Sequence, residues 1–324
     1  MNNLLNNKVI AFFKLIRFEN LIMIGATQFL LRYFVLQKIF QLNNIEFELN
    51  DGLFYLVVLS TILIAAAGYI INDYFDVRTD LINHPDTVVV GKTIKRRMAI
   101  ILHITFTFLG IVLGTYAALK TGYLRLTIFH ITAAFLLWVY STQLKKRLLV
   151  GNIVVSLLTA AVAFMPLVYE MGVMQKLNPG FVFTHRHMLF SCFKITFIFS
   201  LFAFITSLAR EIIKDIEDYE GDKATGGMTM PITWGIQVSK LNAFFLLVIT
   251  VILLFFVVYN TIKVQRVVFS VNNIYIIAAL ILPLIVLAFY LLRSKLNRHY
   301  KNASLILKFI MFMGLCYSFI FYYN

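Results

Sequence analysis

The chain has 324 residues, of which 60% are hydrophobic and only 14% are charged, and its formal net charge is +14. A soluble domain usually carries about 25% charged residues, so this composition excludes an ordinary soluble protein and indicates a chain surrounded by lipid. In such a chain a basic excess serves membrane topology and the attraction of anionic lipid or substrate, so we expect no nucleic acid as a partner.

Apolar runs of membrane-spanning length recur along the whole chain. The segment 1–20 is amphipathic and lacks the cleavage site of a secretory signal, which favours an interfacial helix before the first span. We then predict nine spans, at about 20–40, 53–71, 98–119, 123–143, 149–169, 188–207, 241–260, 273–292 and 303–322. The fold class is therefore all-α, a polytopic membrane protein with about nine transmembrane helices.

Basic residues gather in the segments on one side of these spans, and this side is expected to face the cytoplasm. It includes the N-terminal segment and the two longest connections, 72–97 and 208–240. Nine spans then place the C-terminus outside. We expect a multi-pass protein of the cell (inner) membrane with its N-terminus and both long loops in the cytoplasm.

Acidic residues concentrate in the same two connections. The chain has 15 of them, and ten lie in the stretches 73–86 and 211–222. If the helix of the second span continues, four oxygen-bearing side chains share an arc of about 100°: Asn72, Asp73, Asp76 and Asp80. In the second stretch four carboxylates share an arc of about 60°: Glu211, Asp215, Asp218 and Asp222. Gly221 is expected to end the regular helix just before Asp222.

Two such clusters indicate a metal site. Like charges one turn apart repel each other, and carboxylates at the end of a membrane span are costly. A divalent cation offsets both effects, and Mg²⁺ typically takes one or two carboxylates together with water and phosphate oxygens. Two facing clusters would hold Mg²⁺ around a diphosphate. The alternative is a pair of acidic, solvated helix ends.

Basic and polar residues at other span ends allow two interpretations. Lys145 and Lys146 follow the fourth span, five and six residues after Tyr140, and are candidates to contact a diphosphate or an anionic acceptor. They are equally typical of a membrane anchor with an interfacial tyrosine. The same two interpretations apply to Arg17 and Asn20 at the start of the first span.

These motifs resemble a known family. Asn72-Asp73-x-x-Asp76-x-x-x-Asp80 resembles the first aspartate motif of the UbiA superfamily of intramembrane prenyltransferases, and Asp218-x-x-x-Asp222 resembles the second. Tyr140-Ser-x-x-Leu-Lys145 is similar to the tyrosine–lysine element of the family. The residues of these motifs are most similar to those of the geranylgeranylglycerol-phosphate geranylgeranyltransferase branch. The resemblance covers about residues 12–322 and implies one domain, 1–324, with helices around a central cavity.

The resemblance implies Mg²⁺-dependent transfer of a prenyl group from an allylic prenyl diphosphate to a lipid-like or aromatic acceptor, such as a prenylated glycerol phosphate or a quinone precursor. Membrane lipid is a further partner, and no obligatory protein partner is expected. The implied metal ligands are Asn72, Asp76, Asp80, Asp215, Asp218 and Asp222. The implied catalytic residues are Asp76, Asp218, Lys145 and Tyr140. The implied substrate-binding residues are Asn72, Arg17, Asn20, Arg78, Lys92 and Arg210.

One segment departs from the family pattern. Many relatives read Asn-x-Pro-x-Arg-Pro after the first motif, and this chain reads Asn-His-Pro-Asp-Thr-Val from residue 83. Thr87 therefore stands where the family has an arginine, which puts one diphosphate contact of the family in question. Arg78 and Lys92 are the candidates to replace it.

Two other classes of membrane protein fit the sequence less well. Carboxylates within spans are typical of an ion-coupled transporter, but here they lie at span ends, and no paired Gly/Pro interruption is visible. A CDP-alcohol phosphotransferase would need a single Gly- and Arg-containing aspartate motif, which is absent from the sequence.

Overall fold

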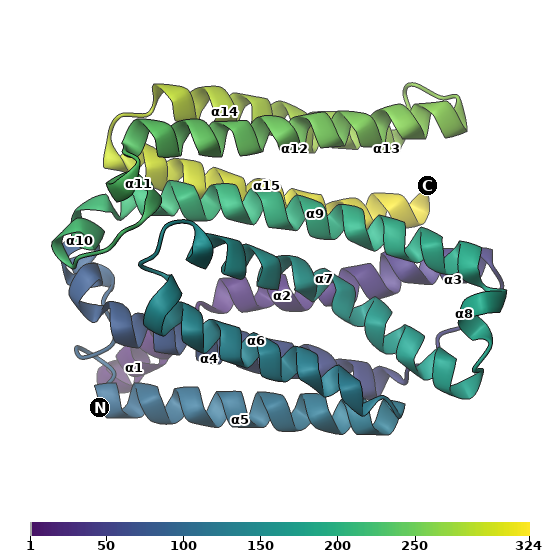
Figure 1. Cartoon of the computed structure of the whole chain (residues 1–324), viewed down its shortest axis with the longest axis horizontal. Coiled ribbons are helices and arrows are strands. Elements are labelled where there is room, and N and C mark those ends of the chain that lie inside the picture. Colours follow the sequence, from purple (N-terminus) through teal and green to yellow (C-terminus); the bar gives the residue numbers. More distant parts are fainter. Residues whose placement is uncertain (1) are drawn as a thin grey trace.

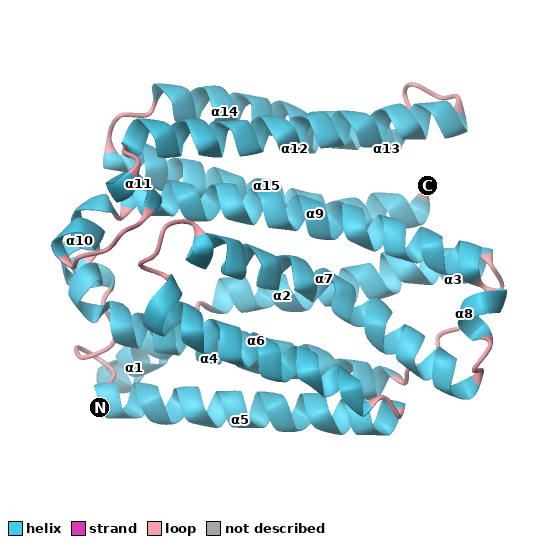
Figure 2. Ribbon diagram, in the orientation of Figure 1, coloured by secondary structure: helices cyan, strands magenta, loops and turns pink. Residues whose placement is uncertain are grey.

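The computed structural model describes residues 2–324, and the regular elements of this part of the chain are helices. Figure 2 shows helices joined by loops, and the one strand-type pairing among the described residues is an isolated bridge between Val90 and Ile94. The predicted all-α class is therefore confirmed. Helices are expected in such apolar runs because a backbone in lipid must satisfy its hydrogen bonds within the segment.

Eight segments of the described chain are long and apolar enough to cross a membrane, and each covers most of one predicted span. They are Asp51–Asn83 (α4), Arg96–Thr121 (α5), Leu124–Leu144 (η3, α6 and η4), Val150–Leu177 (α7), Arg186–Glu217 (α9), Ile236–Val264 (within α12, Ile236–Gln265), Val271–Arg293 (α13, η5 and α14) and Asn297–Tyr323 (α15). The composite segments consist of η3 Leu124–Leu126, α6 Thr127–Val139, η4 Tyr140–Leu144, α13 Val271–Tyr275, η5 Ile276–Ile281 and α14 Leu282–Arg293.

The first predicted span, 20–40, accounts for the difference between nine and eight. Three consecutive helical elements cover it: α2 (Phe18–Leu30), the π-helical η1 (Leu31–Leu36) and α3 (Gln37–Leu42). This segment is less apolar than the other eight because Gln28 and Arg32 lie in its middle. Both side chains are buried inside the protein, which keeps their polar groups away from lipid. The amphipathic segment before it forms α1, Asn2–Leu15.

The long helices lie side by side, and their connections gather at two opposite ends of the bundle (Figure 1). The N-terminus, α10 (Tyr219–Ala224) and α11 (Met230–Thr233) lie at one end, whereas the C-terminus and α8 (Phe181–Thr184) lie at the other. Both long predicted loops thus share an end with the N-terminus. Termini at opposite ends agree with an odd number of passes, eight apolar segments plus the more polar one.

Buried apolar side chains form several clusters instead of one central core. One cluster joins α9, α12, α14 and α15 and includes Ile213, Leu247 and Leu307. Another joins α1, α2, α4 and α5 and includes Leu15 and Ile70. A cavity lies between α2, α4, α6, α7, α9 and α15, and one of its ends is polar.

Candidate active site

The two acidic segments, 135 residues apart in sequence, contact each other directly at the end of α4. The side-chain amide of Asn83 donates to the Asp218 carbonyl oxygen at 2.9 Å and accepts from the backbone N–H of Gly221 at 2.8 Å. His84 Nε2 lies 2.8 Å from Asp218 Oδ1. A Cβ atom at residue 221 would lie 2.5 Å from the Asn83 amide, so only glycine fits this contact.

This contact also breaks the second helix. In a continuous α-helix the N–H of Gly221 would bond to the carbonyl of Glu217, but here it bonds to Asn83. Accordingly α9 ends at Glu217, and α10 begins at Tyr219. The prediction that Gly221 ends the regular helix is therefore wrong, because Gly221 lies inside α10. Asp222 accordingly belongs to α10 and does not share a face of α9.

The carboxylates of the two segments converge on Lys145. The ammonium group of Lys145 pairs with Asp76, whose side chain is buried. Asp222, from the second segment, is near enough to Lys145, Asp218 and Asp76 for all three to influence its titration. Burial raises the pKa of Asp222 to about 6. Burial alone would lower the pKa of Lys145, but Asp76 more than offsets it and raises that pKa.

His84 and Asp218 form a second charged contact outside the spans. The hydrogen bond to Asp218 raises the pKa of His84, which favours the protonated ring. Burial would raise the pKa of Asp218, but the hydrogen bond from His84 and the charge of Lys214 hold it below its ordinary value. Asp218 is therefore an ionised carboxylate held in place by the loop that follows α4.

Other helices fix the remaining charged groups. Arg17, at the junction of α1 and α2, has a left-handed backbone with φ of 49° and pairs with Asp73 at 3.0 Å. On α7, Asn152 donates to Asp215 Oδ2 at 2.7 Å. Gly151 lets α7 begin against η4, because a Cβ there would lie 2.7 Å from the Leu144 carbonyl oxygen. The site is thus assembled from α2, α4, η4, α7, α9 and α10.

A cavity of about 680 Å³ opens from this cluster into the bundle. Eight of the predicted site residues line it: Arg17, Asn20, Asn72, Tyr140, Lys145, Arg210, Asp215 and Asp218. Its other end is mostly apolar, with side chains such as Ala65, Leu136, Leu158 and Met165. The volume lies within the range of ligand sites in proteins, and the lining suits a ligand with one highly charged end and a long apolar part.

The other predicted residues lie outside this lining. Asp76, Asp80 and Asp222 are not among the lining residues, and Asp76 is paired with Lys145. Arg78 and Lys92 are exposed, and Lys92 Nζ donates to the carbonyl of Pro85 at 2.6 Å. Contrary to expectation, the structure brings neither of these two cations to the cavity in place of the missing arginine. The reason is that Arg78 lies on the exposed face of α4, and Lys92 lies in the exposed connection after α4.

Four residues that were not predicted from the sequence belong to the site or border it. Lys214 and Lys308 line the cavity together with Glu211 of the predicted carboxylate cluster, and Asn83 and His84 hold Asp218. Lys308 could have been noticed as an isolated cation inside the last apolar span. Asn83 and His84 gave no such signal, because their role depends on a partner far away in the sequence.

The donor atoms fit a hard cation such as Mg²⁺. Among residues 2–324, no three His, Cys, Asp or Glu side chains are arranged as a ready metal site. However, Asn72 Oδ1 is buried without a hydrogen-bond partner, and such an atom requires an explanation. Together with Asp215 and Asp218 on the cavity wall, it offers oxygen ligands of the kind that Mg²⁺ shares with phosphate oxygens.

Comparison with known sequences gives a consistent result. The model of the UbiA prenyltransferase family matches residues 45–317. A digeranylgeranylglyceryl phosphate synthase of Methanothermobacter thermautotrophicus is 32% identical over 190 residues, which is 58% of this chain and 59% of the relative. The chain thus spans less than two thirds of that relative. The synthase of that name from Pyrococcus abyssi is 30% identical over 245 residues, or 76% of either chain.

Solved structures have the same fold. The structure of a digeranylgeranylglyceryl phosphate synthase superposes with a TM-score of 0.63 at 25% identity, covering 97% of this chain and 98% of the other. A UbiA homologue from Archaeoglobus fulgidus, solved with DMAPP and Mg²⁺, superposes with a TM-score of 0.52 at 18% identity over 94% of this chain and 98% of the other.

Proposed function

Because the chain belongs to the UbiA prenyltransferase family, we propose that it transfers a prenyl group from an allylic prenyl diphosphate to a lipid-like acceptor within the membrane. The family assignment agrees with the resemblance seen in the sequence. The observation that carries the proposal is the meeting of carboxylates from α4 and from α9–α10 around Lys145, at the polar end of an apolar cavity.

We propose Mg²⁺ as the metal. Its ligands would come from both segments: Asn72, Asp76, Asp80, Asp215, Asp218 and Asp222. The buried, unpaired oxygen of Asn72 supports this assignment. Bound there, the metal would supply positive charge that stabilises the leaving diphosphate.

The chain's own residues would do the rest. Lys145, Arg17 and Arg210 would hold the diphosphate at the polar end, and Tyr140 and Asn20 would orient the substrates beside it. The bond between the allylic carbon and the diphosphate oxygen breaks, and its electron pair leaves with the diphosphate. The acceptor oxygen forms the new bond to that carbon and gives its proton to the released diphosphate. The apolar wall excludes water, which would otherwise hydrolyse the donor.

For the acceptor we propose a prenylated glycerol phosphate. The relatives named digeranylgeranylglyceryl phosphate synthase support this choice over an aromatic quinone precursor. The family assignment speaks against the ion-coupled transporter, and the carboxylates lie at helix ends and not in the middle of the spans.

The test is product analysis. Membranes that contain the chain are incubated with a prenyl diphosphate and either a prenylated glycerol phosphate or an aromatic acid, and the products are identified by mass spectrometry. We expect an ether product with the glycerol phosphate. Transfer only to the aromatic acid would overturn the acceptor, and intact diphosphate with every acceptor would overturn prenyl transfer.

We further propose that the chain lies in the cell (inner) membrane with its N-terminus and the active-site loops in the cytoplasm. The basic excess at that end of the bundle supports this orientation. In intact cells a membrane-impermeant thiol reagent should miss Thr87→Cys and should label Phe269→Cys, an exposed position in the connection between α12 and α13. The reverse pattern would invert the topology.

A further inference from the structure

Lys308 lines the cavity as well, but its ion-pair partner lies outside the two acidic segments. Arg17, Lys145 and Arg210 pair with carboxylates of the two acidic segments. Lys308, on α15, also lines the polar end of the cavity, but its ammonium group lies 2.8 Å from Glu19 Oε2 at the start of α2. The Glu19 side chain is 87% exposed, so this ion pair lies at the rim between the cavity and the surroundings.

An ion pair of this kind holds its lysine weakly. Pairs with an exposed partner contribute about 0–1 kcal/mol, because solvent competes for the charges. A hydrogen bond between an ammonium group and a more highly charged anion such as a phosphate monoester is stronger. A phosphate that enters the cavity can therefore replace Glu19 as the partner of Lys308 without a rearrangement of the helices.

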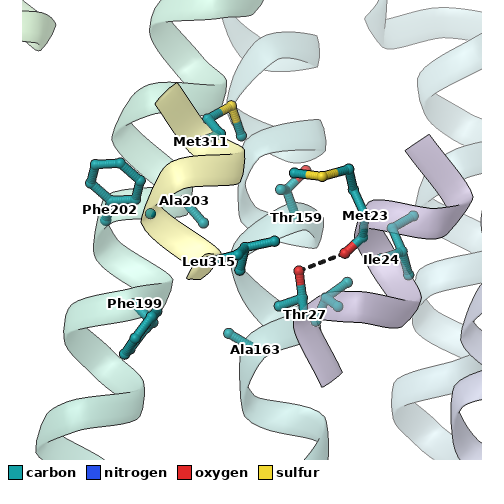
Figure 3. Close-up of a pocket in the computed structure, with 12 residues that line it drawn as sticks. Met23, Ile24, Thr27, Thr159, Ala163, Phe199, Phe202, Ala203, Met311 and Leu315 are labelled. Atoms are coloured by element: carbon teal, nitrogen blue, oxygen red, sulfur yellow. Dashed lines mark hydrogen bonds between the residues drawn. The ribbon is translucent and has the colours of Figure 1, made fainter. Parts of the chain in front are cut away.

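Directly beyond Lys308, α15 borders a second, smaller cavity. This small apolar pocket has a volume of about 90 Å³ and lies between α2, α7, α9 and α15. Met311, one turn after Lys308, lines both the main cavity and the small pocket. Figure 3 shows Leu315, another turn further, pointing into the same space as Thr27 of α2. Ala163 and Ala203 leave this space open, because their side chains are short.

The order of groups along α15 matches a lipid with a phosphate head. Lys308, Met311 and Leu315 follow at intervals of three and four residues, which places them on one helix face. The face is thus cationic at the cavity rim and apolar further in. The pocket, of about 90 Å³, has room for a small apolar group such as the first part of an isoprenoid tail.

We propose that Lys308 binds the phosphate of the acceptor and that the small apolar pocket receives the beginning of the acceptor's tail. The donor diphosphate is then held separately by Lys145 and the two acidic segments. This assignment rests on the proposed function and adds to it a place for the second substrate, a phosphate monoester that carries an apolar chain.

The two partners of the ion pair provide a matched test. Lys308→Gln should raise the KM for a prenylated glycerol phosphate about tenfold or more, as expected from the loss of a charged hydrogen bond. It should leave the KM for the prenyl diphosphate and the kcat at saturating acceptor unchanged. Glu19→Gln breaks the same ion pair but frees the lysine, so it should not raise the acceptor KM. Lys308→Arg should restore most of the affinity.

Two outcomes would overturn the proposal. If both Gln variants raise the acceptor KM alike, the ion pair is only a structural link between α2 and α15. If Lys308→Gln raises the KM of the donor instead, Lys308 belongs to the diphosphate site. Neither outcome affects the proposed function, which would fail only if the unmodified chain forms no prenylated product.

The small apolar pocket is tested by filling it. Ala203→Leu should raise the KM for an acceptor with a full isoprenoid tail, whereas the KM for a short-tailed glycerol phosphate should stay the same. Unchanged thermal stability of the purified variant would show that the helices still pack. If Ala203→Leu changes the KM for the two acceptors by the same factor, or changes neither, the pocket is not the place of the tail.

Discussion

Two charged clusters lie toward opposite ends of the bundle, one buried and one only partly buried, and their charges are balanced differently. Toward the end with α3 and α8, Arg32 and Glu170 are each at most 2% exposed and lie 3.9 Å apart. Glu170 accepts hydrogen bonds from the backbone N–H groups of Glu48 and Leu49, at 2.6 and 3.1 Å. The Arg32 guanidinium lies over the ring of Phe54, with its carbon 4.4 Å from the ring centre.

The cluster at the other end has more carboxylates than cations. Arg17, Lys145 and Arg210 each pair with one carboxylate. Among the described residues, three others have no cationic partner within 4 Å: Asp80, Asp215 and Asp222. The buried members of the first cluster neutralise each other and fasten the segment before α4, which is a structural task. An unneutralised excess of buried and part-buried carboxylates is costly unless another cation binds, and that is the arrangement expected of a metal-dependent site.

The largest expected effect is on prenyl transfer, when one carboxylate of either acidic segment is removed. Asp76→Asn and Asp218→Asn should each lower prenyl transfer by about 10³-fold or more, and the double variant should be little worse, because the residues act as a unit. Radiolabelled or mass-spectrometric product assays measure the loss. Asp86→Asn, an exposed acidic residue of the same connection, is the control and should keep its activity.

Chelation of divalent metal should have the same effect as these variants. Full activity in either single variant, or activity that survives chelation, would contradict the proposed metal site. Losses in the double variant that equal the product of the single losses would instead indicate two independent sites.

The next effect concerns the cation between the two acidic segments. Lys145→Ala should lower kcat by about 10²-fold, the effect of losing one positioned donor to a developing negative charge. Lys95→Ala removes a basic residue at the same end of the bundle, but outside the cavity lining, and should stay within about twofold of the unmodified chain. Steady-state kinetics compares the two variants. Equal losses would mean that general positive charge, and not a positioned contact, is what matters.

Substitution in the cluster of Arg32 and Glu170 should change the stability of the protein and not its kcat. Glu170→Gln removes the buried carboxylate beside Arg32, which then keeps only the exposed Asp51 at 3.3 Å, and should lower the free energy of unfolding by about 3 kcal/mol. Thermal or denaturant unfolding in detergent measures this, with the exposed Glu46→Gln as the matched control. The kcat of the folded fraction at low temperature should be unchanged. A large loss of kcat in the folded protein would show that the two ends are coupled.

The smallest effect should come from the contact that ties the acidic segments together. Asn83→Ala removes two hydrogen bonds worth about 1 kcal/mol each, so the Mg²⁺ concentration for half-maximal activity should rise about tenfold, with less change in kcat at saturating metal. Thr87→Ala, in the same connection, should leave the metal requirement unchanged. If Asn83→Ala lowers kcat at every metal concentration, Asn83 acts in some way other than positioning Asp218.

Much of this architecture could be predicted from neighbouring residues alone. The apolar runs determine where helices cross lipid, because a span must satisfy its own backbone hydrogen bonds, and eight of the predicted spans have this length and composition. The face shared by Asn72, Asp76 and Asp80 follows from helical geometry, because α4 continues unbroken to residue 83. The Tyr140 and Lys145 spacing belongs to one local segment as well.

Other features depend on contacts between distant segments, which helical periodicity does not contain. The break of α9 at Asp218 exists because Asn83 takes the hydrogen bond of Gly221. Only helix packing decides that Lys145 pairs with Asp76, that Lys308 reaches the cavity, and that Arg78 and Lys92 remain outside it. A local sequence pattern indicates which residues share one helix face. The ion-pair partner of each charged side chain is determined by the tertiary neighbours that can neutralise it at the lowest desolvation cost.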